Sequence, residues 1–309
     1  MAPTAGADSV SLNELANQVR DLQLRIASLE KRLGGQEIEE ADVSGQAGEA
    51  ATGALPSTGQ IAPLFGKAFL GLAGAYMLRA LVEMGTIPVA AGIGLGLLYA
   101  AAWMFMASRT SEHERIVTIC RGITACLILI PLLWEAQLRF SLFPSPVTAA
   151  LLFTFAVLGL AVSWRRNLTS LAWLTSMSSL AATLALLVAT KDLIPFTWAL
   201  LGIALAVEAS ACLNHWLTER WLVAVAVNLA TLLMVVVTVI PSGGPQGYVP
   251  FPREAALAVL AALLTVYLAS TLARTLWRGF AMTGFEMAQC VIAFAISAGG
   301  AIRISEGNP

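Results

Sequence analysis

Long apolar stretches follow one another along the chain from about residue 61, and short polar connectors separate them. Each stretch approaches the roughly 20 residues that an α-helix needs to cross about 30 Å of hydrocarbon. The pattern predicts an all-α protein, a polytopic transmembrane bundle of about nine helices. We expect these helices at residues 63–83, 88–107, 116–138, 146–163, 168–189, 196–213, 221–240, 254–273 and 282–301.

The connectors are of two kinds that alternate along the chain. One kind contains an apolar residue followed by proline, at Pro88, Pro144, Pro195 and Pro250, and the other kind is basic and often contains tryptophan. An internal period of this length is typical of a repeated two-helix unit. Because each hairpin has two helices, successive hairpins share one orientation. We therefore expect four parallel hairpin repeats and a closing ninth helix rather than an inverted repeat.

A different pattern marks residues 10–33, where apolar residues recur at alternating spacings of three and four. β-Branched residues at the central a positions and leucine at d favour a parallel two-stranded coiled coil. Its interface would be made by Leu12, Val19, Ile26 and Leu33 at a, and by Leu15, Leu22 and Leu29 at d. The chain is therefore predicted to form a homo-oligomer. The alternative is a single amphipathic helix that lies on the bilayer or on another part of the protein.

Residues 34–60 are rich in small and acidic residues and contain no lysine or arginine. Such a composition cannot bury a core, so it predicts an acidic flexible linker. The expected organisation is a disordered start at 1–9, a coiled coil at 10–33, the linker at 34–60, a transmembrane bundle at 61–303 and a tail at 304–309. The first 60 residues lack the apolar core of a signal peptide, so we expect the first transmembrane helix to direct insertion.

The composition indicates that the lipid bilayer is the main partner of this chain. Hydrophobic residues make up 58% of it and charged residues 12%, against about 45–50% and about 25% in soluble domains. The net charge of −1 gives no basic field, so nucleic acid is not an expected partner. The four cysteines form no CxxC pair, and the connectors leave no room for a catalytic domain. We therefore expect no metal, no cofactor and no enzymatic activity.

Basic residues in the connectors predict the orientation, because cytoplasmic connectors are enriched in lysine and arginine. The side that carries the N-terminus has Lys67, Arg109, Arg115, Arg165, Arg166, Arg220, Arg274 and Arg278. The other side has Arg79, Arg139, Lys191, Arg253 and Arg303. The first set is larger, so we expect the N-terminus in the cytoplasm and the C-terminus outside.

The end of the first helix and the whole second helix resemble a known family. Within residues 78–88, a basic residue, Arg79, is followed by an acid, Glu83, then by Gly85 and an apolar turn. This segment resembles the bacterial predicted multi-pass membrane proteins of domain of unknown function 2339, with the best match over residues 61–109. The chain would be a short, divergent member. The resemblance implies a location in the bacterial inner membrane, and it brings no activity.

Three polar side chains inside the predicted helices are candidates for a ligand or proton site. Glu208 lies about 20 Å along its helix, where an ionisable group is costly unless it is paired or protonated. Glu286 is a second intramembrane carboxyl, and Asn228 lies mid-membrane, where it should hydrogen-bond a neighbouring helix. The alternatives are a protonated or water-contacting Glu208 near the interface, and a Glu286 that reaches the interface by snorkelling.

Two further motifs have structural interpretations. Gly92 and Gly96 lie four residues apart in an apolar helix, which predicts a close helix–helix packing surface rather than a dinucleotide-binding loop. Two pairs of opposite charge have the i,i+4 spacing of a local ion pair: Arg79 with Glu83, and Glu135 with Arg139.

Two functions fit a multi-pass inner-membrane protein with these features. The first is a non-enzymatic envelope scaffold or assembly protein that self-associates through residues 10–33. The alternative is a transporter or lipid-handling protein with an intramembrane carboxyl site at Glu208, which would bind a small-molecule or lipid ligand. A packed bundle would favour the scaffold, and a polar pocket that reaches Glu208 would favour the transporter.

Overall fold

The computed structural model describes residues 58–110, 114–214, 220–239, 247–279 and 281–306. The chain divides into two compact units, residues 1–56 and residues 57–309, and all described helices belong to the second. The predicted disordered start, the coiled coil at 10–33 and most of the linker lie outside the described residues.

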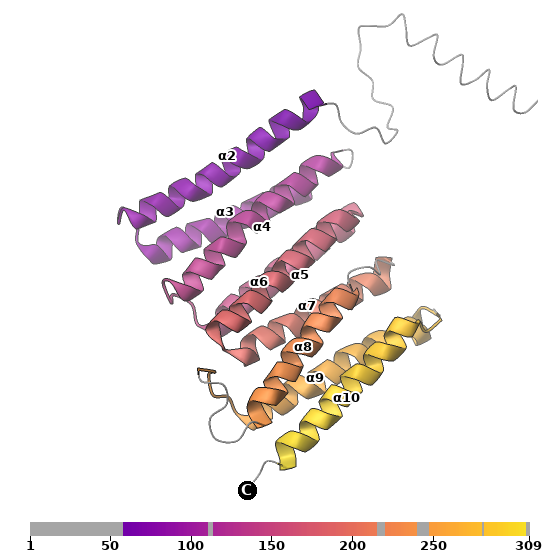
Figure 1. Ribbon diagram of the computed structural model, residues 1–309. Helices are drawn as coiled ribbons and strands as arrows, with labels where there is room; N and C mark the ends of the chain where they lie inside the picture. Colours follow the sequence, from indigo (N-terminus) through magenta and orange to yellow (C-terminus); the bar gives the residue numbers. More distant parts are fainter. Residues whose placement is uncertain (1–57, 111–113, 215–219, 240–246, 280, 307–309) are drawn as a thin grey trace, which may run out of the picture. The chain divides into compact units, whose positions relative to one another are not determined.

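The described part of the chain is all-α, as predicted, and nine of its helices are long and apolar enough to cross a membrane. Their order along the chain is visible in Figure 1. The helices are α2 (Thr58–Glu83), α3 (Val89–Arg109), α4 (Arg115–Leu138), α5 (Ser145–Arg166), α6 (Thr169–Thr190), α7 (Leu193–Asn214), α8 (Arg220–Val239), α9 (Arg253–Leu272) and α10 (Gly284–Glu306). A short π-helical turn, η1 (Ala273–Trp277), continues α9.

Proline begins several of these helices. Pro88, Pro144 and Pro252 each occupy the position just before a first helical residue. Proline suits a helix start because it lacks an N–H group and its φ is already close to the helical value. Helix α7 includes Pro195 in its first turn and begins at Leu193, earlier than the predicted residue 196, because a first-turn proline forfeits no internal hydrogen bond.

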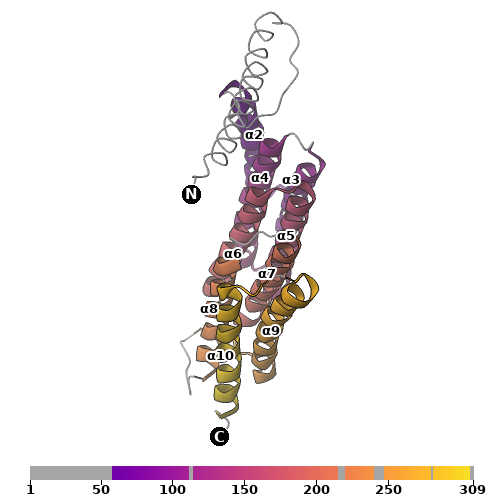
Figure 2. The ribbon, with the colours of Figure 1, turned by 90° about the vertical axis from the view of Figure 1, so that its right-hand side faces the viewer.

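The helices lie in two rows. Each helix from α4 to α10 contacts the helix immediately before it and the helix two places before it. The even-numbered helices therefore form one row and the odd-numbered helices α3, α5, α7 and α9 the other, which Figure 2 shows end-on as two columns. We call face A the end of the bundle where even-numbered helices begin and odd-numbered helices end, and face B the opposite end.

The core is densest in the middle of the bundle. In the apolar spans of α6 and α7, 56% of the residues are buried, whereas in the span of α2 only 6% are. Large apolar side chains remain exposed along α2 and α10, including Phe69, Tyr76, Val291 and Phe294. Such a surface suits contact with lipid, because hydrocarbon tails solvate it without cost.

The predicted packing surface on α3 is confirmed. A methyl group added at Gly92 would meet the Val82 side chain, and one added at Gly96 would lie 2.8 Å from Leu132. Gly94, on the other side of the helix, has nothing within 4 Å of the same position. Gly92 and Gly96 therefore let α2 and α4 approach α3 closely.

Candidate functional site

Four helix ends at face A bring together two carboxylates and two guanidinium groups. Glu208 lies in the last two turns of α7, and Arg220 is the first residue of α8. Arg274 belongs to η1 and Glu286 to the first turn of α10. All four are buried, with between 2% and 4% of each residue exposed. We call this group the four-charge cluster.

Arg220 occupies the centre of the cluster. Its Nε and Nη2 atoms donate to the two carboxylate oxygens of Glu208, at 2.9 Å and 2.6 Å. This is the two-pronged geometry that makes arginine–carboxylate pairs strong. Its third nitrogen, Nη1, donates to Oε1 of Glu286 at 3.3 Å, and Arg274 forms an ion pair with the same oxygen. The four side chains thus form one continuous chain of ion pairs.

Neutral neighbours complete the cluster. The Ser270 hydroxyl donates to Oε2 of Glu208 at 2.6 Å, so α9 joins α7 and α8. Glu286 also caps its own helix, because its Oε2 accepts the N–H of Thr283 at 3.0 Å, which is one half of a capping box. The Arg220 guanidinium lies 5.1 Å from the centre of the Phe285 ring, within cation–π range.

The charges of the cluster cancel, because two carboxylates face two guanidiniums. A carboxyl at the depth of Glu208 would be costly if it were alone. The structure differs from both expectations for Glu208, because its carboxylate is neither exposed to water nor alone. It also places Glu286 away from solvent, at 2% exposure, so its side chain does not reach the interface by snorkelling. The sequence-predicted carboxyls are brought together through Arg220.

Asn228 lies deeper, two turns into α8, and it does not touch the cluster. Its Nδ2 donates to Oε1 of Gln289 at 3.1 Å, and Nε2 of Gln289 donates back to Oδ1 of Asn228 at 3.3 Å. This confirms that Asn228 hydrogen-bonds a neighbouring helix, in this case α10. Since each amide uses one donor and one acceptor, the pair joins α8 to α10 below the four-charge cluster.

A groove of about 620 Å³ runs along α7 and α9 beside Glu208. Most of its walls are apolar, with Leu205, Ala209 and Leu213 on one side, and Arg278 lies at one end. The groove is therefore not a polar pocket, although it reaches one member of the cluster.

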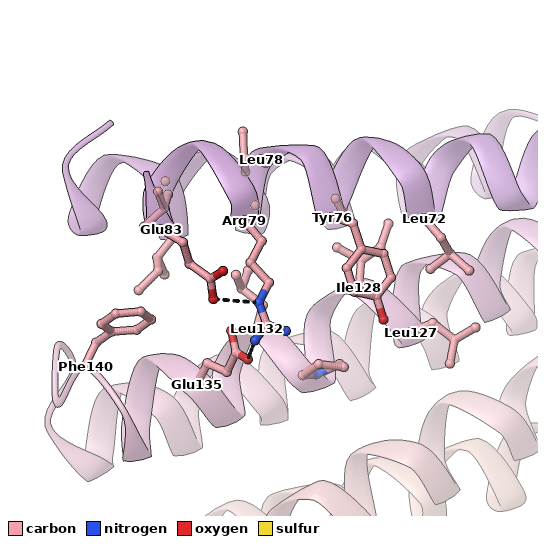
Figure 3. Close-up of a pocket in the computed structure, with 16 residues that line it drawn as sticks. Leu72, Tyr76, Leu78, Arg79, Glu83, Leu127, Ile128, Leu132, Glu135 and Phe140 are labelled. Carbon is pink, nitrogen blue, oxygen red and sulfur yellow. Dashed lines mark hydrogen bonds and ion pairs between the residues drawn. The ribbon is translucent and has the colours of Figure 1, made fainter. Parts of the chain in front are cut away.

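A second group of four charges lies at face B, between α2 and α4. Figure 3 shows three of its members, Arg79, Glu83 and Glu135, beside a pocket of about 100 Å³. Arg79 contacts Glu83 at 3.3 Å, as the i,i+4 spacing predicted, and also Glu135 at 2.7 Å. The predicted pair of Glu135 with Arg139 is replaced by contacts across the helices, because Arg139 binds Glu83 at 3.0 Å. Three of the four side chains are more than 40% exposed, so these pairs contribute little to stability.

The partners of Glu208 and Glu286 were not identified from the sequence. Arg220 and Arg274 looked like connector charges, because they lie at the ends of apolar stretches. Ser270 had no distinguishing signal. The sequence does contain one hint. Two acids and two arginines lie near helix ends, and because successive helices alternate in direction, these four ends lie at the same face.

Among the residues that the structure describes, no group of three or more His, Cys, Asp or Glu side chains is placed to hold a metal ion. The cysteines Cys120, Cys126, Cys212 and Cys290 are all free thiols.

Comparisons with protein-family models, with curated proteins and with solved structures find no match for this chain. The resemblance of residues 61–109 to domain of unknown function 2339 stays a prediction.

Proposed function

We propose that this protein is a non-enzymatic scaffold or assembly protein of the bacterial inner membrane. In this proposal the bundle is a multi-pass anchor of tandem hairpins, and residues 10–33 join copies through a coiled coil. The observation that carries it is the closed four-charge cluster. Arg220 engages both Glu208 and Glu286, so the buried charges are used to hold four helix ends together rather than left open for a passing ion.

The packing of the bundle supports the same proposal. Each helix from α4 to α10 contacts its two predecessors, which is what a parallel array of hairpins requires. An anchor of this kind needs a rigid membrane body and an exposed association element. The heptad of residues 10–33 supplies such an element by sequence, and the body concentrates the chains in two dimensions, which favours a short coiled coil.

The test compares two matched double variants of the full-length protein in detergent. Leu22→Asp with Ile26→Asp places charges at the d and a positions of the heptad, where two strands would meet. Asn17→Asp with Lys31→Asp changes the net charge by −3, against −2 for the a/d variant, and does so at f positions, which face solvent in any coiled coil. We expect an oligomer for the parent and for the f variant, and a monomer for the a/d variant, measured by native mass spectrometry. An unchanged oligomer in the a/d variant would reject self-association through this segment.

The groove beside Glu208 favours a second candidate, a lipid-handling or transport protein. Its walls are apolar and its volume is about 620 Å³, within the range of small-molecule sites. Ala209→Trp would fill the groove and leave the ion pairs of Glu208 in place, which Glu208→Gln would not. A small molecule or lipid that copurifies with the parent and is lost from Ala209→Trp would support this candidate. Identical bound masses in both proteins would remove it.

A further inference from the structure

A different groove, of about 330 Å³, opens between α2, α3 and α4 near face A. Its lining includes hydrogen-bond donors from all three helices, among them Lys67 from α2, Trp103 from α3 and Arg121 from α4. Trp103 lies six residues before the end of α3 and Arg121 six residues after the start of α4. At about 1.5 Å per residue, both lie about 9 Å inside the ends of their helices, and from that depth a long arginine side chain can extend towards the headgroups at face A.

Arg121 differs from the four arginines of the two charge groups. The four arginines in the two groups of four charges each contact a carboxylate. Arg121 instead donates through Nη1 to the carbonyl oxygen of Met106 at 2.8 Å and to the hydroxyl oxygen of Thr110 at 2.7 Å. These neutral oxygens fix its position at the C-terminal end of α3, and within the described part of the chain Arg121 forms no ion pair with a carboxylate. No carboxylate is among the described residues that line the groove.

Trp103 provides a second, independent observation. Its indole Nε1 is buried and has no acceptor within the described part of the protein. The hydroxyl of its neighbour Tyr99 donates to the carbonyl oxygen of Gly71 at 3.1 Å. A buried N–H group without an acceptor is unfavourable. An acceptor supplied by a ligand in the groove would satisfy it.

We propose that this groove binds an anionic phospholipid. The phosphate lies between Lys67 and Arg121, Trp103 donates to a phosphate or glycerol oxygen, and an acyl chain follows the apolar wall made by Leu70 and Met106. Basic pockets between transmembrane helices are typical sites for anionic headgroups, and guanidinium and ammonium groups form charge-assisted hydrogen bonds with phosphate. The described lining of the groove comes from α2, α3 and α4, so lipid binding there does not rest on the proposed scaffold function.

The test measures lipid binding to the full-length protein in detergent by native mass spectrometry. Phosphatidylglycerol and phosphatidylcholine are offered in equal amounts, and inorganic phosphate is offered separately. We expect one phosphatidylglycerol to bind in preference to phosphatidylcholine. In Lys67→Gln with Arg121→Gln, the affinity for phosphatidylglycerol should fall at least tenfold.

The matched control is Arg109→Gln with Arg115→Gln. It removes the same charge near the same face, but from exposed side chains outside the groove, so it should keep the parent affinity. Trp103→Phe keeps an aromatic side chain but removes the N–H together with the five-membered ring of the indole, and it should weaken binding severalfold. Equal binding of the two lipids, equal losses in the groove variant and the control, or binding of inorganic phosphate with no lipid preference would each overturn the proposal.

Discussion

Arg220 serves two carboxylates at once, and this sharing determines the cost of changing any member of the four-charge cluster. Glu208 receives two hydrogen bonds from Arg220 and one from Ser270. Glu286 receives the third Arg220 bond and has Arg274 as a second partner. Removing Arg220 would therefore leave Glu208 with only a hydroxyl, while Glu286 would keep a guanidinium. At this scale the weak point of the protein is the pair of Glu208 and Arg220.

Replacing Arg220 with methionine should lower the free energy of unfolding by about 3–5 kcal/mol, because it leaves a buried carboxylate uncompensated. The double variant Arg220→Met with Glu208→Gln should lose less than the sum of the two single variants, because it removes both charges of the pair. Unfolding in detergent, followed by circular dichroism against denaturant, measures all three.

The control for this prediction is Arg115→Met, which removes an exposed arginine at the same face and should change stability by no more than about 0.5 kcal/mol. Additive losses in the double variant would show that Glu208 and Arg220 act independently, contrary to the geometry.

At the scale of the helix, the sequence predicts where the helices occur and how long they are, but it does not predict which side chains pair between them. The nine helices were predictable because a membrane-spanning segment must be long and uniformly apolar. Glu208 was predictable as an isolated charge in such a segment. Arg220 was not predictable as its partner, because an arginine at a helix end can equally well be a connector charge that keeps this end in the cytoplasm. Only the packing of α7 against α8 decides between these roles.

Glycine positions give a prediction at the same scale. A methyl group added at Gly159 in α5 would lie 2.6 Å from both Cβ and Oγ1 of Thr175 in α6, and the Cβ atom is held by the backbone and cannot rotate away. Gly159→Ala should therefore lower the free energy of unfolding by about 1–3 kcal/mol through overpacking. Gly94→Ala has open space and should raise it by up to about 1 kcal/mol, because alanine favours the helix. Denaturation of both variants under one condition gives the comparison, and losses of equal size would contradict the packing described here.

For the whole molecule, the odd number of spans in the described region has a topological consequence. Nine helices of alternating direction place the start of α2 at face A and the end of α10 at face B. Arg121, which the count of connector charges omitted, lies near face A. It adds to the basic residues on that side, and the larger basic set is expected in the cytoplasm.

We therefore expect a green fluorescent protein fused before Met1 to fluoresce, and an alkaline phosphatase fused after Pro309 to be active. The first reporter requires the cytoplasm, and the second requires the oxidising side of the membrane. Fluorescence and phosphatase activity of the two fusions in whole cells provide the measurement. If the C-terminal phosphatase fusion were inactive and green fluorescent protein fused at the C-terminus fluoresced instead, the assignment of faces would be reversed.

The two-row packing also bears on how the protein is made. Every helix from α4 onward finds its neighbours among the two helices synthesised just before it, and no later helix has to enter between earlier ones. Glu208 precedes Arg220 by only twelve residues, so its neutralising partner leaves the ribosome within about one to two seconds at ordinary rates of synthesis. The bundle can thus be completed one helix at a time at the insertion site, and the most costly charge in it is exposed to lipid alone for only a brief interval.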